Sequence, residues 1–432
     1  MKRLTAIALT LLLALGLGLP ALALEGDYEI SNPYEDAFEN GWGTFKANLH
    51  THTTFSDGSE SLQTMVEEYY KQGYDVIANT DHGVVSKPWD QKPMTVFPLN
   101  VASIGKPNGV LSTARAGEIS RGEGENSENR GGRKMIQVPK GIELQAATVF
   151  KSHVVGLYGG WGYGWIGLST DFRIPIAMTE KAGGVSIIAH PGDWLGSAKD
   201  ADIARDPANV NFFAGILRDY DSCLGIEVYN GGDGPTRHDR VLWDQLLMRL
   251  MPEKIPVWGF ANDDSHDTGS IGRTAEILFM ENNTPEDVKN CIKTGAFLAC
   301  THRENPLGID GDRTKPFPGI TNITVAPDGK SITIVPDANC DGIVWITDGE
   351  EHLDVGYTID LTNEKIKSYV RAQLVNADGV TATQPFGVDK GDGYEGPNDA
   401  PTGWARFSWF VKMYLTKNIF GWLVENIAKL FK

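Results

Sequence analysis

The placement of histidines constrains the fold of this chain more than any other feature of its sequence. Six of the nine histidines stand at the end of a short apolar run or directly beside one: His50, His52, His82, His153, His190 and His266. Three carboxylates accompany them: Glu143 and Asp264, which lie in or after such runs, and Asp57, which follows the first two histidines in Phe55-Ser56-Asp57-Gly58. Strand ends converge on one polar site when the strands run side by side in the same direction. The pattern therefore predicts strands arranged around a single site.

The first two of these histidines show why a metal is expected at that site. His50 and His52 stand two residues apart at the end of the run 45–49. Alternate residues of a strand share a face, so both imidazoles point to one side, which we expect to be the barrel interior. Gathering buried imidazoles and carboxylates is costly without a cation to pair them. This mixture of ligands suits zinc, iron or manganese.

Strand-like runs alternate with helical patterns from about residue 44 to about residue 301. The strand-like runs lie at 45–49, 75–79, 135–142, 149–157, 185–189, 224–229, 257–261 and 296–299. Helical patterns lie between several of them: one follows Ser59, which could cap it, and another spans 285–293 behind the capping residue Thr284. Alternation of this kind predicts an α/β fold with a closed barrel over residues 44–305.

The segments around and within this barrel differ from it in composition. Residues 1–23 predict a signal peptide, since Lys2 and Arg3 precede an apolar run that ends at a cleavage-site pattern. Residues 306–388 predict a small all-β module, and residues 389–403 a linker rich in Gly, Asp and Pro. Residues 84–140 form a long basic insertion, which is either an anion-gathering lid or a solvated surface segment. We therefore expect a secreted protein of more than one unit.

The last segment, residues 404–432, is aromatic and basic and predicts an amphipathic helical tail. Such segments lie flat at the headgroup boundary of a membrane, so we expect peripheral membrane contact through this tail. Packing of the tail on the protein itself is the alternative. Spanning is disfavoured, because Lys412, Lys417 and Glu425 interrupt every long apolar run.

Charge and cysteine content narrow the remaining possibilities. The formal net charge is −17, which argues against nucleic acid as the main partner, because phosphate contacts need a basic surface. The four cysteines leave buried thiols and one disulfide bridge equally open.

The residues beside the strand ends resemble those of a known family. The matching pieces are Leu49-His50-Thr51-His52, Ser56-Asp57-Gly58, Thr80-Asp81-His82, Gly141-Ile142-Glu143, His153, Ala189-His190-Pro191 and Asp264-Ser265-His266. In this order they closely resemble the polymerase and histidinol phosphatase (PHP) family of metallohydrolases. The resemblance implies a distorted, seven-stranded TIM-like barrel that binds two or three divalent ions, zinc, manganese or iron.

The same resemblance implies a ligand set for each ion. One ion would be held by His50, His52, Glu143 and Asp264. Glu143 would bridge to a second ion held by His153 and His190, and a third would lie on Asp57, His82 and His266. The chain departs from the family at Asn262-Asp263, where Gly-Ser is usual, and an extra carboxylate there could alter the choice of metal.

The chemistry expected of such a centre is hydrolysis by metal-activated water, since bound cations lower the pKa of water toward neutrality. His50, His52, Glu143 and Asp264 are the expected catalytic residues, with Asp81 either orienting a ligand histidine or capping a loop. Asn230 and Arg303 are candidates for substrate contact, each with a purely structural alternative.

Phosphoester hydrolysis is the expected reaction, because it is the commonest chemistry of the family, and the expected substrate is a small, phosphorylated molecule. Hydrolysis of a carbamate, ester or amide on the same fold is one alternative. A non-catalytic surface-binding protein with a structural metal site is the other, although the complete ligand set argues against it.

Overall fold

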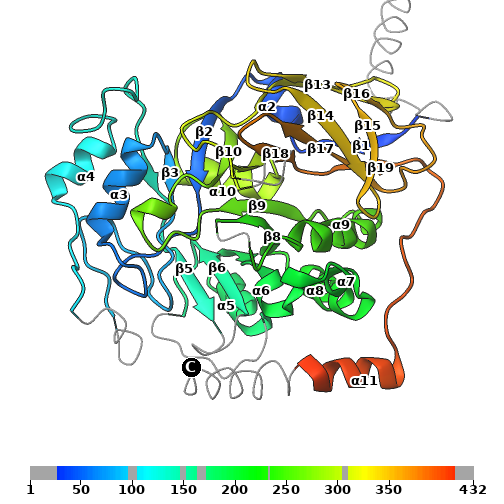
Figure 1. Ribbon diagram of the computed structural model, residues 1–432, viewed down its shortest axis with the longest axis horizontal. Helices are drawn as coiled ribbons and strands as arrows, with labels where there is room; N and C mark the ends of the chain where they lie inside the picture. Colours follow the sequence, from blue (N-terminus) through cyan, green and yellow to red (C-terminus); the bar gives the residue numbers. More distant parts are fainter. Residues whose placement is uncertain are drawn as a thin grey trace, which may run out of the picture.

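The computed structural model describes residues 27–95, 105–145, 152–162, 172–231, 234–303 and 310–413 (Figure 1). The expected signal peptide (1–23) and most of the tail (414–432) lie outside these described residues. The described chain has a mixed α/β fold, as expected.

The larger sheet has eleven strands and runs from the β module into the barrel-like part. Its path follows β1 (Glu29–Ser31), β19 (Phe386–Asp389), β17 (Tyr369–Val375), β18 (Val380–Thr383), β11 (Phe297–Thr301), β10 (Thr274–Met280), β2 (Gly43–Asn48), β3 (Val76–Ile77) and β4 (Ile136–Gln137). β14 (Gly342–Thr347) pairs with β17 and with β15 (Glu351–Val355) off this path. The module is thus joined to the rest of the fold by a hydrogen-bonded ladder between β18 and β11.

Two smaller sheets complete the strands. One contains β12 (Ile320–Val325), β13 (Ser331–Pro336) and β16 (Thr358–Asp360) and belongs to the module. The other contains β5 (Ile142–Gln145), β6 (His153–Leu157), β7 (Val185–Ile188), β8 (Cys223–Asn230) and β9 (Trp258–Asn262).

The ladders of the described residues do not close into the seven-stranded barrel that the sequence predicts. β2 pairs antiparallel with β10 on one side, which leaves β9 paired only with β8. Only isolated bridges, Thr51 to Ser265 and His82 to Glu143, join the two sheets, and both lie just beyond the ends of β2 and β3. A closed barrel needs a continuous ladder around its circumference. These two bridges lie at the edge where the histidines stand, and elsewhere the two sheets contact each other through side chains, such as Phe260 of β9 and Phe297 of β11, whose ring centroids are 4.9 Å apart.

Helices cover the outer faces of the sheets (Figure 1). They are α2 (Glu35–Glu39), α3 (Leu62–Lys71), α4 (Thr113–Ile119), α5 (Arg173–Lys181), α6 (Pro191–Leu195), α7 (Asp202–Arg205), α8 (Pro207–Asp219), α9 (Asp239–Leu250), α10 (Pro285–Thr294) and α11 (Gly403–Val411). Thr284 caps α10 as expected, because its side chain accepts a hydrogen bond from the Asp287 N–H. α3 is capped by Ser61 and not by Ser59.

The long insertion packs on the barrel through a core of its own. Trp89, Leu111, Ile119 and Met135 are buried against α3. Arg130 is 5% exposed and donates to the backbone oxygens of Tyr70 and Tyr74. Its neighbour Arg133 binds Asp75. These two arginines bind groups of the protein itself, and the buried side chains show that the insertion is more than a solvated surface segment. Its role in gathering anions stays a prediction.

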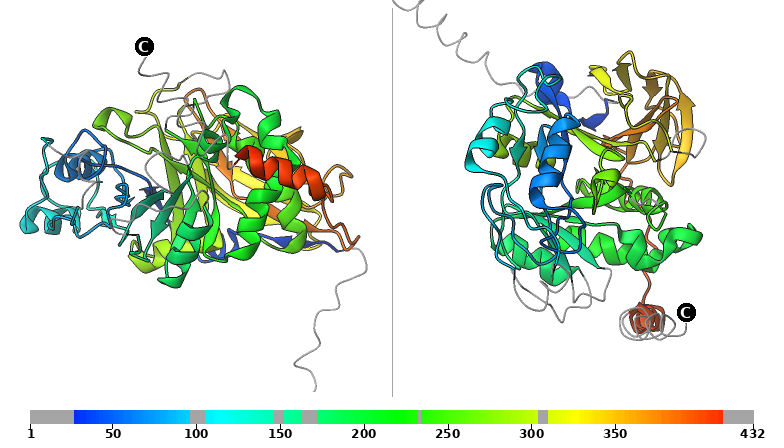
Figure 2. Two further views of the ribbon diagram at one scale, coloured as in Figure 1. Left: turned by 90° about the horizontal axis from the view of Figure 1, so that it is seen from below. Right: turned by 60° about the vertical axis from the view of Figure 1, so that its left-hand side comes forward.

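α11 at the start of the tail lies beside α8 (Figure 2). Trp409 packs on Phe212, with ring centroids 5.2 Å apart, and its indole N–H donates to Asn209. Trp404 and Phe407 on the same helix are exposed, 77% and 53% respectively. One side of α11 therefore packs on the protein and another faces solvent. No helix among the described residues is long and apolar enough to cross a membrane.

The four cysteines Cys223, Cys291, Cys300 and Cys340 are free thiols in this structure, and the first three are buried. Of the two possibilities left open by the sequence, buried thiols account for most of them.

Candidate metal centre

The nine expected ligand residues come from both sheets. They lie together at the edge where the bridges Thr51–Ser265 and His82–Glu143 join the two sheets. His50 and His52 follow β2, and Asp57 lies in the loop beyond them. His82 follows β3, Glu143 lies in β5, His153 begins β6 and His190 follows β7. Asp264 and His266 follow β9. Two of the parallel pairs, β2 with β3 and β8 with β9, contribute to the site from their carboxyl ends or from the residues beyond them.

Glu143 is the centre of this arrangement. Its Oε2 lies 2.8 Å from Nδ1 of His82 and 3.2 Å from Nε2 of His52. Its Oε1 lies 2.8 Å from Nδ1 of His153 and 3.3 Å from Nε2 of His190. The carboxylate is 1% exposed. One buried carboxylate thus faces imidazoles on both of its oxygens, as a bridging ligand would.

Three groups of side chains place their ligand atoms within 4.8 Å of one another. The groups are His50, His52 and Asp264; His82, Glu143 and His153; and His52, Asp57, His82 and His266. The first group contains three of the four ligands expected for one ion, without Glu143, and the third contains all three expected for another ion, with His52 added. For the remaining ion, His190 adjoins the second group, because its Nε2 lies 3.3 Å from Nδ1 of His153.

The distances suit ligands of one ion better than hydrogen-bonded partners. Asp264 Oδ1 lies 3.1 Å from Nε2 of His52 and 3.4 Å from Nε2 of His50, but it has no hydrogen-bond partner. Oε2 of Glu143 and Nδ1 of His82 also lack hydrogen bonds despite their proximity. Ligand atoms about 2.1 Å from a tetrahedral ion stand roughly 3.4 Å apart. The residues present therefore fit divalent metal ions.

Hydrogen bonds to Nδ1 fix the orientation of two histidine rings in the site. Nδ1 of His50 lies 2.8 Å from Glu227 Oε1, and Nδ1 of His266 lies 2.9 Å from the Asp264 carbonyl oxygen. A proton on each Nδ1 leaves Nε2 as the free ligand atom. Nε2 of His50 then faces Nε2 of His52 at 3.1 Å, where two lone pairs need a cation between them.

The pKa shifts of the side chains in the site also indicate that it attracts positive charge. Burial opposes the charged form of His190, but contact with Glu143 and the charge of Asp264 outweigh it and raise its pKa to about 9. Burial likewise opposes charge on His266, and Asp57 raises its pKa to about 9. Burial also opposes the charged form of Glu143, but the neighbouring histidines hold its pKa well below the usual range. The carboxylates thus attract positive charge to the rings, and bound cations would take the place of those protons.

Glu227 is a residue of the site that the sequence reasoning missed. It is fully buried in β8 and contacts the ring of His50. Its other oxygen accepts hydrogen bonds from the His190 N–H at 3.0 Å and from Nδ2 of Asn230 at 3.1 Å. A lone carboxylate inside an eight-residue apolar strand was the available signal, because buried acids need partners.

The other three candidate site residues, Asp81, Asn230 and Arg303, lie at different distances from the ligand residues. Asp81 accepts hydrogen bonds from Thr53 and from Ser56, whose Oγ lies 3.3 Å from Nδ1 of His52. Asp81 therefore fixes the loop after β2 and reaches a ligand histidine only through Ser56. Asn230 donates to Asp264 Oδ2 at 3.2 Å and so lies at the centre. Arg303 lies farther out, paired with Asp310.

The extra carboxylate at Asn262-Asp263 has a structural role. Asp263 is 1% exposed and accepts hydrogen bonds from the backbone N–H groups of Gly272, Arg273 and Thr274, each at 2.9 Å. Its oxygens are therefore occupied by the loop before β10, and this residue is not among the three ligand groups.

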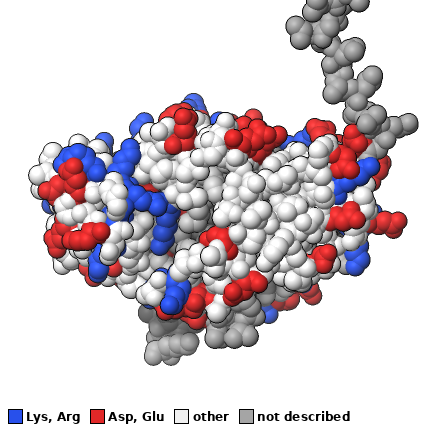
Figure 3. All heavy atoms as spheres, turned by 90° about the horizontal axis from the view of Figure 1, so that it is seen from above, with Lys and Arg blue, Asp and Glu red and all other residues white. Residues whose placement is uncertain are grey.

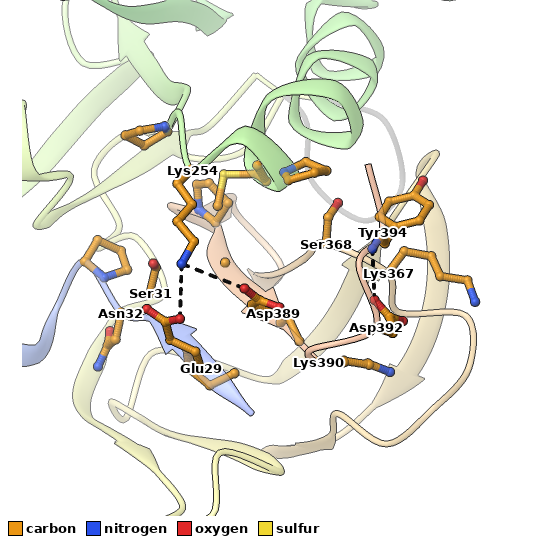
Figure 4. A pocket seen from close by; sticks show the side chains of 18 of the residues that line it. Glu29, Ser31, Asn32, Lys254, Lys367, Ser368, Asp389, Lys390, Asp392 and Tyr394 are labelled. Carbon is orange, nitrogen blue, oxygen red and sulfur yellow. Dashed lines mark hydrogen bonds and ion pairs between the residues drawn. The ribbon is translucent and has the colours of Figure 1, made fainter. Parts of the chain in front are cut away.

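A large cavity of about 690 Å³ lies away from these residues (Figure 4). It is bounded by β1, β19, the 3₁₀ turn η3 (Met251–Glu253) and the chain after Asp389. Lys254 spans it between Glu29 and Asp389. Trp258, which begins β9, lines it, so the cavity adjoins the amino end of that strand and not the end near Asp264. None of its described lining residues is a histidine, and we assign no hydrolysis to it.

No family model and no curated protein matches the sequence. Among solved structures, the chain is similar to a two-domain protein from Bacteroides vulgatus, which is named as containing a predicted PHP-like metal-dependent phosphoesterase. The two chains are 15% identical, with a TM-score of 0.41, and the match covers 80% of this chain and 96% of that one. It is also similar to a lesion-specific endonuclease from Pyrococcus furiosus, with 12% identity, a TM-score of 0.30, and coverage of 58% and 56%. An amidohydrolase from Chromobacterium violaceum has 15% identity and a TM-score of 0.27, with coverage of 51% and 87%.

The first of these structures carries the name of the family whose motifs the sequence resembles. At these TM-scores, none of the three names decides which bond this chain cleaves.

Proposed function

We propose that this protein is an exported metal-dependent hydrolase that cleaves phosphoesters with two or three divalent ions. The observation that carries the proposal is the arrangement around Glu143, where one buried carboxylate faces imidazoles on both oxygens. Resemblance of the ligand motifs to the PHP family favours a phosphoester over a carbamate, carboxylic ester or amide.

The nine ligand residues would form three ligand sets. His50, His52, Glu143 and Asp264 would hold one ion, with Glu143 shared by a second ion on His153 and His190. Asp57, His82 and His266 would hold a third. Bound cations supply a water of lowered pKa and polarise the substrate oxygen.

The surrounding residues would keep this arrangement rigid. Glu227 would hold the ring of His50 in the orientation that leaves Nε2 for the ion. Asp81 would hold the loop that carries Asp57, through Thr53 and Ser56. The side-chain NH₂ group of Asn230, which donates to Asp264 Oδ2, would keep the Asp264 carboxylate turned toward the histidines.

Chelation followed by a substrate panel tests the function. We expect a chelator to abolish activity, and Mn²⁺, Zn²⁺ or Fe²⁺ to restore it, because the buried charges of the site need cations. The panel contains p-nitrophenyl phosphate, bis(p-nitrophenyl) phosphate, p-nitrophenyl acetate and an amino-acid p-nitroanilide. Turnover of the phosphoesters at least about tenfold above the other two substrates supports the proposal. Preference for the acetate or anilide would replace it with the alternative reaction, and full activity in folded, metal-free protein would refute a metal mechanism.

Membrane contact through residues 404–432 stays a prediction. Exposure of Trp404 and Phe407 on α11 supports it, while the packing of Trp409 on Phe212 shows that part of the tail is fixed to the protein. We expect the mature protein to co-sediment with anionic vesicles, and a chain ending at residue 401 to stay in the supernatant. Identical behaviour of both forms would rule the tail out as a tether.

A further inference from the structure

A small pocket between the start of β10 and the chain that follows β11 is lined by three arginines. Its volume is about 80 Å³, and Arg273, Arg303 and Arg313 line it together with His302, Asp310 and Gly311. A cavity needs only about 10–15 Å³ by this measure to hold a water, so the pocket has room for a small oxyanion. On the face seen in Figure 3, Lys and Arg side chains gather in a band toward the end of the molecule that carries α3 and α4.

The first of these arginines ties the pocket to the metal centre. Arg273 immediately precedes β10, and its backbone N–H is bound by Asp263, the neighbour of Asp264. Its guanidinium donates to the carbonyl oxygen of Gly231 at 3.3 Å. Gly231 directly follows Asn230, which donates to Asp264. Hydrogen-bonded residues thus connect the guanidinium to a candidate metal ligand.

The other two arginines approach from the chain that follows β11. Arg303 stands two residues beyond the end of β11, and the N–H of its neighbour His302 donates to the Arg273 carbonyl oxygen at 2.7 Å. Arg313 donates from Nη1 to the carbonyl oxygens of Gly269 and Ile271, in the loop between Asp264 and β10. Backbone contacts therefore hold all three guanidinium-bearing segments around one space.

The charges in this pocket do not balance. Asp310 pairs with Arg303, but no described carboxylate forms an ion pair with Arg273 or Arg313. Nε of Arg303 is buried without a hydrogen-bond partner. Burial, together with the charges of Arg303 and Arg313, lowers the pKa of Arg273. Three cations and one paired acid leave an excess of positive charge, with guanidinium donors available to a ligand.

We propose that Arg273, Arg303 and Arg313 form an anion subsite that binds a second, uncleaved anionic group of the substrate, a phosphate or a carboxylate. The proposal rests on the proposed function and narrows its substrate class to phosphoesters that carry another oxyanion. Guanidinium groups bind such oxyanions through paired N–H donors, and they remain charged at every physiological pH.

Direct binding tests the subsite without relying on catalysis. Inorganic phosphate is titrated calorimetrically into the chelator-treated full-length protein, whose metal centre then holds no cations. We expect Arg313→Gln and Arg303→Gln each to raise the Kd for phosphate by about tenfold or more. The matched control is Arg218→Gln, which removes another arginine, one paired with Glu253 on the surface, and should leave the Kd unchanged. Unchanged melting temperatures exclude misfolding of the variants.

Kinetics then show whether substrates use the subsite. For the metal-loaded enzyme, we expect Arg313→Gln to lower kcat/KM for 3-phosphoglycerate and fructose 1,6-bisphosphate by about tenfold, and that for glycerol 3-phosphate by less than about twofold. Equal losses on all three substrates would overturn the second-anion role. Phosphate binding that is absent from the wild type, or equal in the arginine variants, would overturn the subsite itself. If phosphate binds and the arginine variants lose it while no phosphoester is hydrolysed, the subsite stands and the proposed reaction fails.

Discussion

Replacing Glu143 by glutamine is expected to lower kcat by about 10³-fold or more, even at saturating metal. The substitution keeps the shape of the side chain but places an NH₂ group where an oxygen now faces imidazole nitrogens at 2.8 Å. Removing a single donor that stabilises a transition-state charge costs about 10²–10³ in kcat, and this change disturbs two ions together. Steady-state kinetics with metal content measured on the same sample give the result. A variant with wild-type kcat and a full complement of metal would contradict the central role of Glu143.

A comparison with Glu227→Gln separates ligation from orientation. Glu227 touches the ring of His50 from the side away from the other ligands, so the variant should bind metal more weakly by about 10–100-fold. Excess metal should then recover most of its activity, and the same excess should not rescue Glu143→Gln. If both variants respond alike to metal, Glu227 is itself a ligand.

The residues of the site that could be predicted are those whose role shows in their immediate sequence neighbours. The spacing of two residues between His50 and His52 predicts their shared face, and the other ligand histidines stand at the ends of apolar runs. Glu227 has no such companion in the sequence. Its partners, His50 and Asn262, lie 177 and 35 residues away, and only the folded chain brings them together.

The fold shows the same division between local and distant information. The Thr284 cap of α10 depends on a few neighbouring residues and was predicted correctly. The pairing of β2 with β10 joins segments more than two hundred residues apart, and residues 274–280 were not among the predicted strands. The roles of Arg130 and Arg133 were obscure for a related reason: their basic charge suggested a ligand, while their partner Asp75 lies in a distant part of the chain.

Loss of the Asp244 carboxylate is expected to produce the largest destabilisation at the junction between the module and the barrel-like part. Asp244 in α9 receives two hydrogen bonds from the Arg371 guanidinium, at 2.8 and 2.6 Å, and one from the Tyr369 hydroxyl at 2.8 Å. Both side chains of the ion pair are buried, 2% and 4% exposed. Asp244→Ala leaves Arg371 charged and unpaired, because a guanidinium does not lose its proton, and should lower the free energy of unfolding by about 3–5 kcal/mol. Urea denaturation followed by tryptophan fluorescence measures the change.

An exposed pair of the same kind supplies the control. Arg218 and Glu253 also form two hydrogen bonds, at 2.7 and 2.6 Å, but both residues lie at the surface. Glu253→Ala should therefore cost less than about 1 kcal/mol, since water solvates the arginine that is left behind. The double variant Asp244→Leu with Arg371→Met removes both buried charges and should recover much of the loss, because the penalty arises from the unpaired cation and not from the missing contact. Equal destabilisation by Asp244→Ala and Glu253→Ala would show that burial does not set the strength of this junction.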